Sequence, residues 1–405
     1  MLYQKPSLLH YRFAQVVCGL VSKLIFRNKV LRNEIKGKKE PFVVIANHQC
    51  VLDFVNLIGA CARPMSFVIS RSFFSTLPIQ GYLRKMGVIP KQQFQTTVKD
   101  MKQMKAVIDQ GAPLVIYPAG LMCEDGLSTP IPAATYKFLR WLGVDVYVAR
   151  SYGSYFVMPK WNSGFRPGRT HIDIYKLFSA EELKSVSLKE LKKKTDEALL
   201  FDAYREQETF LCKYQSNHVL EGLEHVLYQC PHCGKEYSIA VRNRSTLVCE
   251  NCGYTVRGDA HGFLHRESPD GPELRYVSDW SRLIFRKLKD TVLEAPDYAV
   301  SLKTRIRTIN GKKNKFEDAG EGTLHLSGEG FLLEGTLKGE QFRLKLPVGN
   351  LPTLPFSPGK HLELQHGNEI YRCLPEDGRL VMKLINLVKI YYQLQSCAPE
   401  AESAK

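Results

Sequence analysis

Residues 42–53 have the sequence FVVIANHQCVLD. The first five residues, Phe42–Ala46, are all apolar and rich in β-branched side chains, which predicts a short strand that is buried on both faces. His48 and Asp53 follow this strand directly. Because ligands in parallel sheets gather beyond the carboxyl ends of the strands, His48 is expected where chemistry usually takes place.

The five-residue spacing between His48 and Asp53 limits how the two side chains can meet. Along one continuous helix, five steps of about 100° point them well apart. We therefore expect a turn through Gln49–Val51 and a helix that begins near Asp53. The carboxylate would then accept the Nδ1 proton of the imidazole and leave Nε2 free as a base. A structural histidine that caps the helix is the alternative, and Cys50 is a less favoured candidate nucleophile within the turn.

Short apolar runs alternate with helical patterns from Phe42 to about Phe178. This alternation predicts an α/β domain with a mostly parallel sheet flanked by helices. The expected strands are Phe42–Ala46, Met65–Ser70, Gly87–Lys91, Leu114–Tyr117 and Val144–Ala149. The expected helices are Phe54–Ala62, Ser75–Met86, Thr97–Gln110 and Ala133–Leu142, followed by a charged helical stretch from a capping box at Ser179 to about Gln215.

Cationic side chains follow several of these strands. If the strands are parallel, then Arg71, Lys91 and Arg150 reach the same edge as His48, together with the segment Pro118-Ala119-Gly120. A histidine base among cations suits an anionic substrate. Since no good protein nucleophile stands beside it, the substrate's own hydroxyl is the group expected to be activated.

Four segments resemble, in order, the motifs of the 1-acylglycerol-3-phosphate acyltransferase (lysophospholipid acyltransferase) family. Asn47–Phe54 is similar to its first motif, Met86–Lys91 to the second, Ile116–Gly120 to the third, and Val144–Ala149 to the strand that carries the fourth. The resemblance implies direct transfer of an acyl group from an acyl thioester, carried by coenzyme A or acyl carrier protein, to a lysophospholipid hydroxyl. In that chemistry His48 is the general base, Asp53 orients it, and no acyl-enzyme forms.

Two positions depart from the family pattern. The family usually has Phe-Pro-Glu-Gly in the third motif, whereas Ala119 replaces the glutamate here, and Glu124 or Asp125 would have to supply an acid. Gln93 stands where the family has a phosphate-binding arginine, so that Lys91 or Arg84 would have to take over that role. By resemblance, the expected substrate-binding residues are Asn47, Arg84, Lys91, Gln93, Pro118, Ala119 and Gly120.

The second half of the chain contains two Cys-x-x-Cys pairs. Cys230 and Cys233 are separated from Cys249 and Cys252 by a fifteen-residue spacer, and a glycine follows each pair. Four thiolates at this spacing predict a small ribbon that holds a closed, structural zinc ion with no open position for catalysis. The other cysteines are scattered singly, which is typical of small buried apolar residues: Cys18, Cys50, Cys61, Cys123, Cys212, Cys373 and Cys397.

The remaining sequence predicts a helix near Ser278–Leu293, a series of antiparallel strands and a final helix at about Asp377–Leu394. The expected strands are Ala299–Ile309, Gly322–Leu326, Phe331–Thr336, Gln341–Leu346, Leu362–Gln365 and Glu369–Cys373. This order of elements resembles a small pleckstrin-homology or GRAM-type barrel with a capping helix. The expected divisions are 1–40 for a membrane-interface segment, 41–215 for the acyltransferase, 228–266 for the ribbon and 276–395 for the β domain.

The charge distribution indicates an anionic partner. The 405-residue chain has a formal net charge of +15, and residues 1–40 contribute +7 of it, with nine basic residues against Glu34 and Glu40. Leu9, Phe13, Val16, Leu20 and Leu24 recur at helical spacing in this segment. Such a basic amphipathic helix can lie in a phospholipid interface, or it can pack its apolar stripe on the protein's own core.

No window is long and apolar enough for a membrane-spanning helix, and the first residues lack the cleavage pattern of a secretory signal. The expected location is therefore the cytoplasmic side of a membrane, as a peripheral protein. Two other classes remain open: a lipid-binding protein without catalytic activity, and a zinc-ribbon protein that binds nucleic acid. The second is disfavoured because the ribbon's spacer offers only Lys235, Arg242 and Arg244 as basic residues, and Tyr237 as its aromatic residue.

Overall fold

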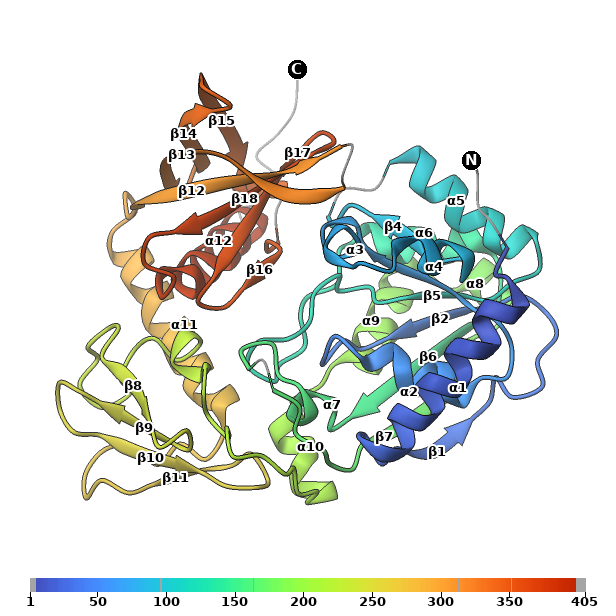
Figure 1. The fold of residues 1–405 in the computed structure, drawn as a ribbon, viewed down its shortest axis with the longest axis horizontal. Coiled ribbons are helices and arrows are strands. Elements are labelled where there is room, and N and C mark those ends of the chain that lie inside the picture. Colours follow the sequence, from blue (N-terminus) through green and yellow to red (C-terminus); the bar gives the residue numbers. More distant parts are fainter. Residues whose placement is uncertain (1–4, 95–96, 163, 312–313, 351, 398–405) are drawn as a thin grey trace. The chain divides into compact units, whose positions relative to one another are not determined.

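The computed structural model describes residues 5–94, 97–162, 164–311, 314–350 and 352–397. The chain divides into two compact units, the first formed by residues 1–217 with 260–262 and the second by residues 218–259 with 263–405. Figure 1 shows a mixed sheet with helices in the first unit, and a small sheet, a long helix and a larger sheet in the second.

The first unit is built on a seven-stranded sheet with the order β1-β7-β6-β2-β5-β3-β4. Neighbouring strands are parallel except for β6 and β7, so the predicted mostly parallel sheet is confirmed. The strands are β1 (Lys29–Asn33), β2 (Val43–Ala46), β3 (Ser66–Ser70), β4 (Ile89–Lys91), β5 (Leu114–Ile116), β6 (Val146–Tyr152) and β7 (His171–Phe178).

Helices cover this sheet. They are α1 (Leu8–Leu24), α2 (Asp53–Ala60), α3 (Arg71–Thr76), α4 (Gln80–Lys85), α5 (Val98–Asp109), α6 (Ala134–Leu142), α7 (Ser154–Val157), α8 (Ala180–Ser185), α9 (Leu188–Leu199) and α10 (Ala203–Phe210). Val43 and Ile45 of β2 belong to a buried cluster with side chains of α5, α6 and α9, and Val44 between them is equally inaccessible. Burial on both faces explains why this strand has a continuous apolar sequence.

Two predicted helices are wrong in extent. The stretch predicted as one helix over 75–86 forms α3 and α4, because Pro78 disfavours helical geometry at Leu77, whose ψ is 133°. The charged stretch after Ser179 forms α8, α9 and α10. Its breaks are marked by new caps, since Ser187 and Asp202 accept backbone hydrogen bonds at the starts of α9 and α10.

The sequence analysis missed β1 and β7. Strand β1 lies at the sheet edge, where four of its five residues are exposed, so no apolar pattern marks it. Strand β7 runs antiparallel to β6 and alternates in burial over most of its length. Both lie beyond β6, so neither supplies the strand ends at which the site is expected.

The second unit begins with a four-stranded antiparallel sheet that carries the four grouped cysteines. Its strands are β8 (Ile239–Arg242), β9 (Thr246–Cys249), β10 (Thr255–Gly258) and β11 (Leu264–Arg266), in the order β11-β10-β9-β8. A short 3-10 turn, η1 (Leu223–His225), precedes the sheet, and the long helix α11 (Val277–Glu294) follows it.

The rest of the second unit is a seven-stranded antiparallel sheet with the order β15-β14-β13-β12-β18-β17-β16. It comprises β12 (Val300–Asn310), β13 (Lys315–Ser327), β14 (Gly330–Leu337), β15 (Glu340–Pro347), η2 (Val348–Asn350), β16 (Phe356–Ser357), β17 (His361–His366) and β18 (Glu369–Pro375), with the final helix α12 (Leu380–Cys397). The predicted antiparallel domain with a last helix is thus confirmed. Strand β13 is longer than predicted because its polar first half also pairs with β12.

Candidate active site

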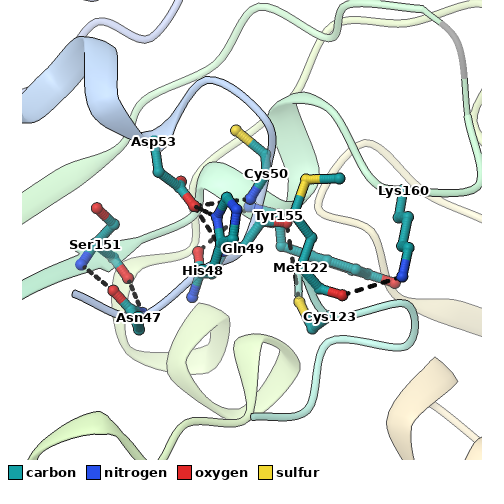
Figure 2. A network of polar contacts seen from close by, with 10 residues as sticks. All are labelled: Asn47, His48, Gln49, Cys50, Asp53, Met122, Cys123, Ser151, Tyr155 and Lys160. Carbon is teal, nitrogen blue, oxygen red and sulfur yellow. Dashed lines mark hydrogen bonds and ion pairs between the residues drawn. The ribbon is translucent and has the colours of Figure 1, made fainter. Parts of the chain in front are cut away.

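His48 and Asp53 meet at the carboxyl end of β2, as the sequence predicted. The chain turns through Gln49–Leu52, and α2 begins at Asp53. The Nδ1 atom of His48 lies 2.9 Å from Oδ2 of Asp53 (Figure 2). Because a carboxylate can only accept, the proton of this bond is on Nδ1, and Nε2 carries the lone pair.

Asp53 is held in place by the same turn. Its Oδ2 atom also accepts the backbone N–H groups of Gln49 at 2.7 Å and Cys50 at 2.9 Å. The side chain is 1% exposed, whereas that of His48 is 21% exposed. The pair therefore presents the imidazole to solvent and keeps the carboxylate behind it. This arrangement suits a general base with an orienting acid.

Asn47 is an anchor for the turn. Its side-chain amide donates to the backbone carbonyl of Ser151 and accepts the backbone N–H of the same residue, both at 2.8 Å (Figure 2). These bonds join the ends of β2 and β6. Because both polar atoms of the amide are used, Asn47 positions the turn that carries His48.

The turn after β5 contacts His48 from another side. The ring of Tyr117 lies 4.4 Å from the imidazole, centroid to centroid, at an interplanar angle of 32°. The chain then turns through Pro118-Ala119-Gly120, with Gly120 at a positive φ of 70° and its N–H bonded to the carbonyl of Tyr117. Further on, the N–H of Cys123 donates to the carbonyl of His48 at 3.1 Å. The segment resembling the third motif is thus joined to the first by backbone and ring contacts.

Gln93 also holds the Gly120 turn. Its side-chain amide nitrogen donates to the carbonyl of Gly120, and its oxygen accepts the hydroxyl of Ser70 at 2.9 Å. The residue therefore ties the end of β3 to the turn after β5. A neutral amide engaged in this way differs in charge and in available donors from the arginine of the family pattern.

The two candidate cations of the second motif lie at different places. Lys91 ends β4, and its ammonium donates to the carbonyl of Gln92 at 3.0 Å. Burial lowers the pKa of Lys91, with the charge of Asp100 acting in the opposite direction. Arg84 is on α4, and its guanidinium lies 5.0 Å from the ring centre of Phe74. Among the described contacts, neither cation touches His48 or Asp53.

Other polar residues near this edge are engaged within the protein. Glu124 and Asp125 are 4% and 8% exposed, so the structure gives neither of them an open carboxylate in place of the missing glutamate. Arg150 lies on β6 and forms an ion pair of 2.6 Å with Glu206 of α10. Lys160, which the sequence analysis did not single out, donates to the carbonyl of Met122 at 3.4 Å. Lys160 lies in the loop after α7, and no pattern in the sequence marks it as a residue near the site.

Cys50 is a poor nucleophile in this setting. Its side chain is fully buried, and burial raises the pKa of the thiol well above the usual value, with the charge of Asp53 adding to the effect. A thiol that stays protonated and enclosed cannot attack a substrate. The single cysteines that the structure describes, Cys18, Cys50, Cys61, Cys123, Cys212 and Cys373, are all buried, as predicted, while the side chain of Cys397 lies outside the described residues.

The four grouped cysteines form a candidate metal centre in the second unit. The Sγ atoms of Cys230, Cys233, Cys249 and Cys252 all lie within 4.8 Å of one another. The pairs Cys230–Cys252 and Cys233–Cys249 are each separated by 3.8 Å. A tetrahedron with zinc–sulfur bonds of ~2.3 Å has edges of about 3.8 Å, so the cluster fits that ion.

Neighbouring groups support the sulfur atoms of this cluster. The side-chain amide of Asn251 donates to Cys233 at 3.5 Å. The hydroxyl of Ser238 lies 3.2 Å from the sulfur of Cys249 and donates to the carbonyl of Lys235 at 3.0 Å. A donor such as the Asn251 amide orients a metal-binding thiolate and stabilises its negative charge. The residues present therefore suit a closed four-thiolate site.

Comparison with known proteins assigns a class to the first unit. Residues 27–161 match the family model described as Acyltransferase, an interval that includes β1 to α7 and both His48 and Asp53. The chain therefore carries an acyltransferase domain.

The structure is also similar to the crystal structure of the 1-acyl-sn-glycerophosphate (LPA) acyltransferase PlsC from Thermotoga maritima. The sequence identity is 20% and the TM-score 0.41, with 50% of this chain and 78% of that chain covered. No curated protein matches the chain.

Proposed function

We propose that this protein transfers a fatty acyl group from an acyl thioester to the hydroxyl of a lysophospholipid, with a 1-acylglycerol-3-phosphate-like acceptor. The observation that carries the proposal is the 2.9 Å bond between His48 Nδ1 and Asp53 Oδ2, within a segment that matches the acyltransferase model. The donor is acyl-CoA or acyl carrier protein. The protein acts as an acyltransferase of the 1-acylglycerol-3-phosphate type.

In the proposed reaction, Nε2 of His48 removes the proton from the acceptor hydroxyl as its oxygen attacks the thioester carbon. The C–S bond then breaks, and the leaving thiolate takes the proton back from Nε2. Asp53 stabilises the imidazolium that forms in between. Backbone N–H groups of the turns support the carbonyl oxygen as it becomes negative. The buried Cys50 is not used, so no acyl-enzyme forms.

The substrate-binding roles are proposed from the resemblance to the family motifs. Lys91 and Arg84 are proposed to supply positive charge for an anionic acceptor, and the Pro118-Ala119-Gly120 turn, which follows the Tyr117 ring that contacts His48, is proposed to contact the acceptor. Asn47 and Gln93 act mainly by fixing the turns, because their amides are bonded to Ser151, and to Gly120 and Ser70. A catalytically inactive lipid-binding protein is the second candidate. The intact His48–Asp53 pair does not favour it.

A membrane phospholipid surface is the proposed location of the reaction. Helix α1 exposes the predicted stripe of Leu9, Phe13, Val16, Leu20 and Leu24, whose residues are 78%, 64%, 64%, 55% and 67% exposed. Its other face, with Tyr11, Ala14 and Cys18, is buried instead. An exposed apolar stripe beside Arg12 and Lys23 suits an anionic lipid interface. None of the helices in the described residues has the length and hydropathy to span a bilayer, and we propose peripheral attachment on the cytoplasmic side.

In the second unit, we propose that Cys230, Cys233, Cys249 and Cys252 hold a structural zinc ion in a zinc ribbon. Zinc would join the end of β9 to the loop before β8 and to the turn between β9 and β10, and all four of its positions would be filled by sulfur. The seven-stranded sheet with α12 is proposed as a PH/GRAM-like domain on the order of its elements. Nucleic-acid binding is not favoured by the ribbon's thin set of basic residues.

The proposed function is tested by incubating the purified full chain with radiolabelled acyl-CoA, or with acyl carrier protein, and a panel of lysophospholipids in mixed vesicles. We expect a labelled diacyl product with at least one lysophospholipid. Absence of product with every acceptor, with lipid binding retained, would favour the inactive lipid-binding protein. Binding of nucleic acid without acyl transfer would favour the ribbon-based alternative.

A further inference from the structure

A second polar residue of the catalytic turn, Gln49, is completely buried. Its side-chain oxygen accepts the backbone N–H of Tyr155 at 3.3 Å, while its amide nitrogen has no hydrogen-bond partner within the described part of the chain. Its backbone N–H is one of the donors to Asp53. Gln49 therefore contacts Asp53 through its backbone and the Tyr155 segment through its side chain, so that a shift of the Gln49 side chain is transmitted to the His48–Asp53 pair.

Glu206 of α10 is the acidic group that faces this amide. One oxygen of its carboxyl group forms the 2.6 Å ion pair with Arg150. The other oxygen is buried and has no partner among the residues that the structure describes. The Gln49 amide lies close enough to favour the ionised form of this carboxyl. An amide donor and a carboxylate acceptor, both buried and otherwise unsatisfied, thus stand opposite each other, and a direct bond or one bridging water satisfies both.

Arg150 fixes Glu206 from β6. Its guanidinium also donates to the carbonyl of Leu200 at 2.7 Å and that of Ala198 at 3.2 Å, at the end of α9. Since Ser151, the next residue, holds Asn47, the same strand supports the catalytic turn at two points. The side chains of Arg150, Glu206 and Gln49 are therefore neighbours in a series that leads from β6 through α10 to the turn, with an ion pair at its first step.

Several titratable groups surround this carboxyl. Tyr152 of β6 and Asp202 at the start of α10 act on it electrostatically, and His171 of β7 and Tyr214 border the same small void. Burial raises the pKa of Glu206 to about 7, although the Arg150 guanidinium favours the charged form. The Glu206 carboxyl group is therefore mostly ionised above this pH and mostly protonated and neutral below it.

We propose that Glu206 is a positioning residue for the acyltransferase site, which holds the catalytic turn through Gln49 only when its carboxyl is ionised. This inference rests on the proposed function for its activity readout. Above the titration, the carboxylate binds the Gln49 amide and fixes the turn behind His48. Below it, a neutral acid binds the amide less strongly, and the turn loosens. Acyl transfer then depends on the ionised form of Glu206.

The activity test compares wild-type protein with Glu206→Gln over pH 5 to 9, with Glu208→Gln on the exposed side of α10 as the matched control. For the wild type, the fall of log kcat on the acid side should include the titration of Glu206. For Glu206→Gln we expect this part of the pH dependence to be lost, so that the acid side is less steep, together with a kcat at pH 8 lowered on the order of tenfold and little change in KM. A slope and kcat like those of the wild type would overturn the inference. The Glu208→Gln variant should follow the wild type.

A second readout separates this inference from the proposed function. In protein labelled with ¹⁵N-glutamine, the Gln49 side-chain resonance is assigned by its loss in Gln49→Leu and followed through the same pH range. We expect it to titrate in the wild type and not in Glu206→Gln. If the wild-type protein shows no acyl transfer, the proposed function is wrong, but the titration of the Gln49 resonance still tests the Glu206–Gln49 interaction. If the Gln49 resonance of the wild type does not change with pH, the Glu206–Gln49 interaction is overturned whether or not the protein is active.

Discussion

At the scale of single residues, the catalytic turn depends on one carboxylate oxygen. Oδ2 of Asp53 accepts from the imidazole and from two backbone N–H groups, so it both orients the base and shapes the turn. In the proposed reaction, the negative charge of Asp53 stabilises the imidazole when it becomes cationic. The shape of the turn requires only an acceptor at this position.

We predict that Asp53→Asn leaves the protein folded but lowers kcat by about 10³-fold to 10⁴-fold, because the amide cannot stabilise the imidazolium and favours the wrong tautomer. The measurement is kcat under saturating donor and acceptor, with the melting temperature as a check on folding. An Asp53→Asn protein that keeps a third or more of the wild-type kcat would show that acyl transfer does not need the negative charge of Asp53.

Cys50 provides a separate test of direct transfer. We predict that Cys50→Ala keeps kcat within about threefold of the wild type, since its buried thiol remains protonated. Intact-mass spectrometry of wild-type protein mixed with the donor alone should show no added acyl group. A labelled adduct that disappears in Cys50→Ala would instead establish an acyl-enzyme.

The position of a residue was predictable from the sequence only where the neighbouring residues determine the local structure. The strand, the turn and the start of α2 at Asp53 follow from the apolar run and the spacing of the pair. The ring of Tyr117 over His48 could not be predicted, because it depends on the packing of two turns that are far apart in the chain. The same holds for Glu206, which lies more than 150 residues after Gln49 and has no motif.

At the scale of elements, the two faces of α1 differ in exposure and in their proposed role. Tyr11 on the inner face is 0% exposed, whereas Leu9 and Phe13 on the outer face are 78% and 64% exposed. The apolar stripe was predictable from its spacing, whereas its direction was not. The structure leaves the stripe exposed and buries Tyr11, Ala14, Cys18 and Ser22, and the hydroxyl of Ser22 donates to Asn56 of α2 at 2.9 Å.

The two faces of α1 should respond differently to substitution. We predict that Leu9→Ser, Phe13→Ser and Val16→Ser together reduce co-sedimentation with anionic vesicles by at least tenfold and hardly change the melting temperature. The exposed Leu188→Ser on α9 is the matched control and should bind as the wild type does. In contrast, Tyr11→Ala should cost about 3–5 kcal/mol of unfolding free energy. Vesicle binding that survives the triple substitution would contradict the assignment of this surface.

Elements were predicted well where burial produces a pattern and poorly where it does not. The fully buried strands β2 and β5 have continuous apolar sequences, which identify them clearly. Strand β1 is an exposed edge, and the first half of β13 is polar although it pairs with β12. The breaks in the two helices that were predicted too long have local signals in the sequence, namely Pro78 and the caps at Ser187 and Asp202. The continuous helical periodicity of the apolar residues hides these signals.

At the scale of the whole molecule, an acyltransferase unit precedes a unit that contains the four-cysteine sheet and the larger antiparallel sheet. The four strands of the small sheet are three or four residues long, and each of them buries one aliphatic side chain: Ile239, Leu247, Val256 and Leu264. A metal ion is therefore expected to contribute to the stability of the sheet. The strands of the larger sheet, apart from β16, were predictable from their alternating pattern and Gly-rich turns, and the four-cysteine cluster was predictable from its spacing, whereas strands β8–β11 were not predicted. The sequence gives no signal for the return of residues 260–262 to the first unit.

We predict that purified protein contains one zinc ion per chain and that a strong chelator removes it with loss of ordered structure around β8–β11. Atomic absorption and hydrogen exchange of residues 228–266 measure the two effects. The acyltransferase unit should keep its exchange protection, because its core includes no residue of the cluster. A metal-free protein whose small sheet remains protected would show that the cluster is not a structural zinc site.

The central claim is that His48 is the base of an acyl transfer, and the rate of the His48→Ala protein tests it most directly. Wild-type and His48→Ala proteins are compared with the same lysophospholipid, the same acyl thioester and the same vesicles, after equal melting temperatures and equal vesicle binding have been verified. The account predicts turnover by the wild type and none above the background reaction by His48→Ala. Turnover by His48→Ala at a rate near that of the wild type would contradict it.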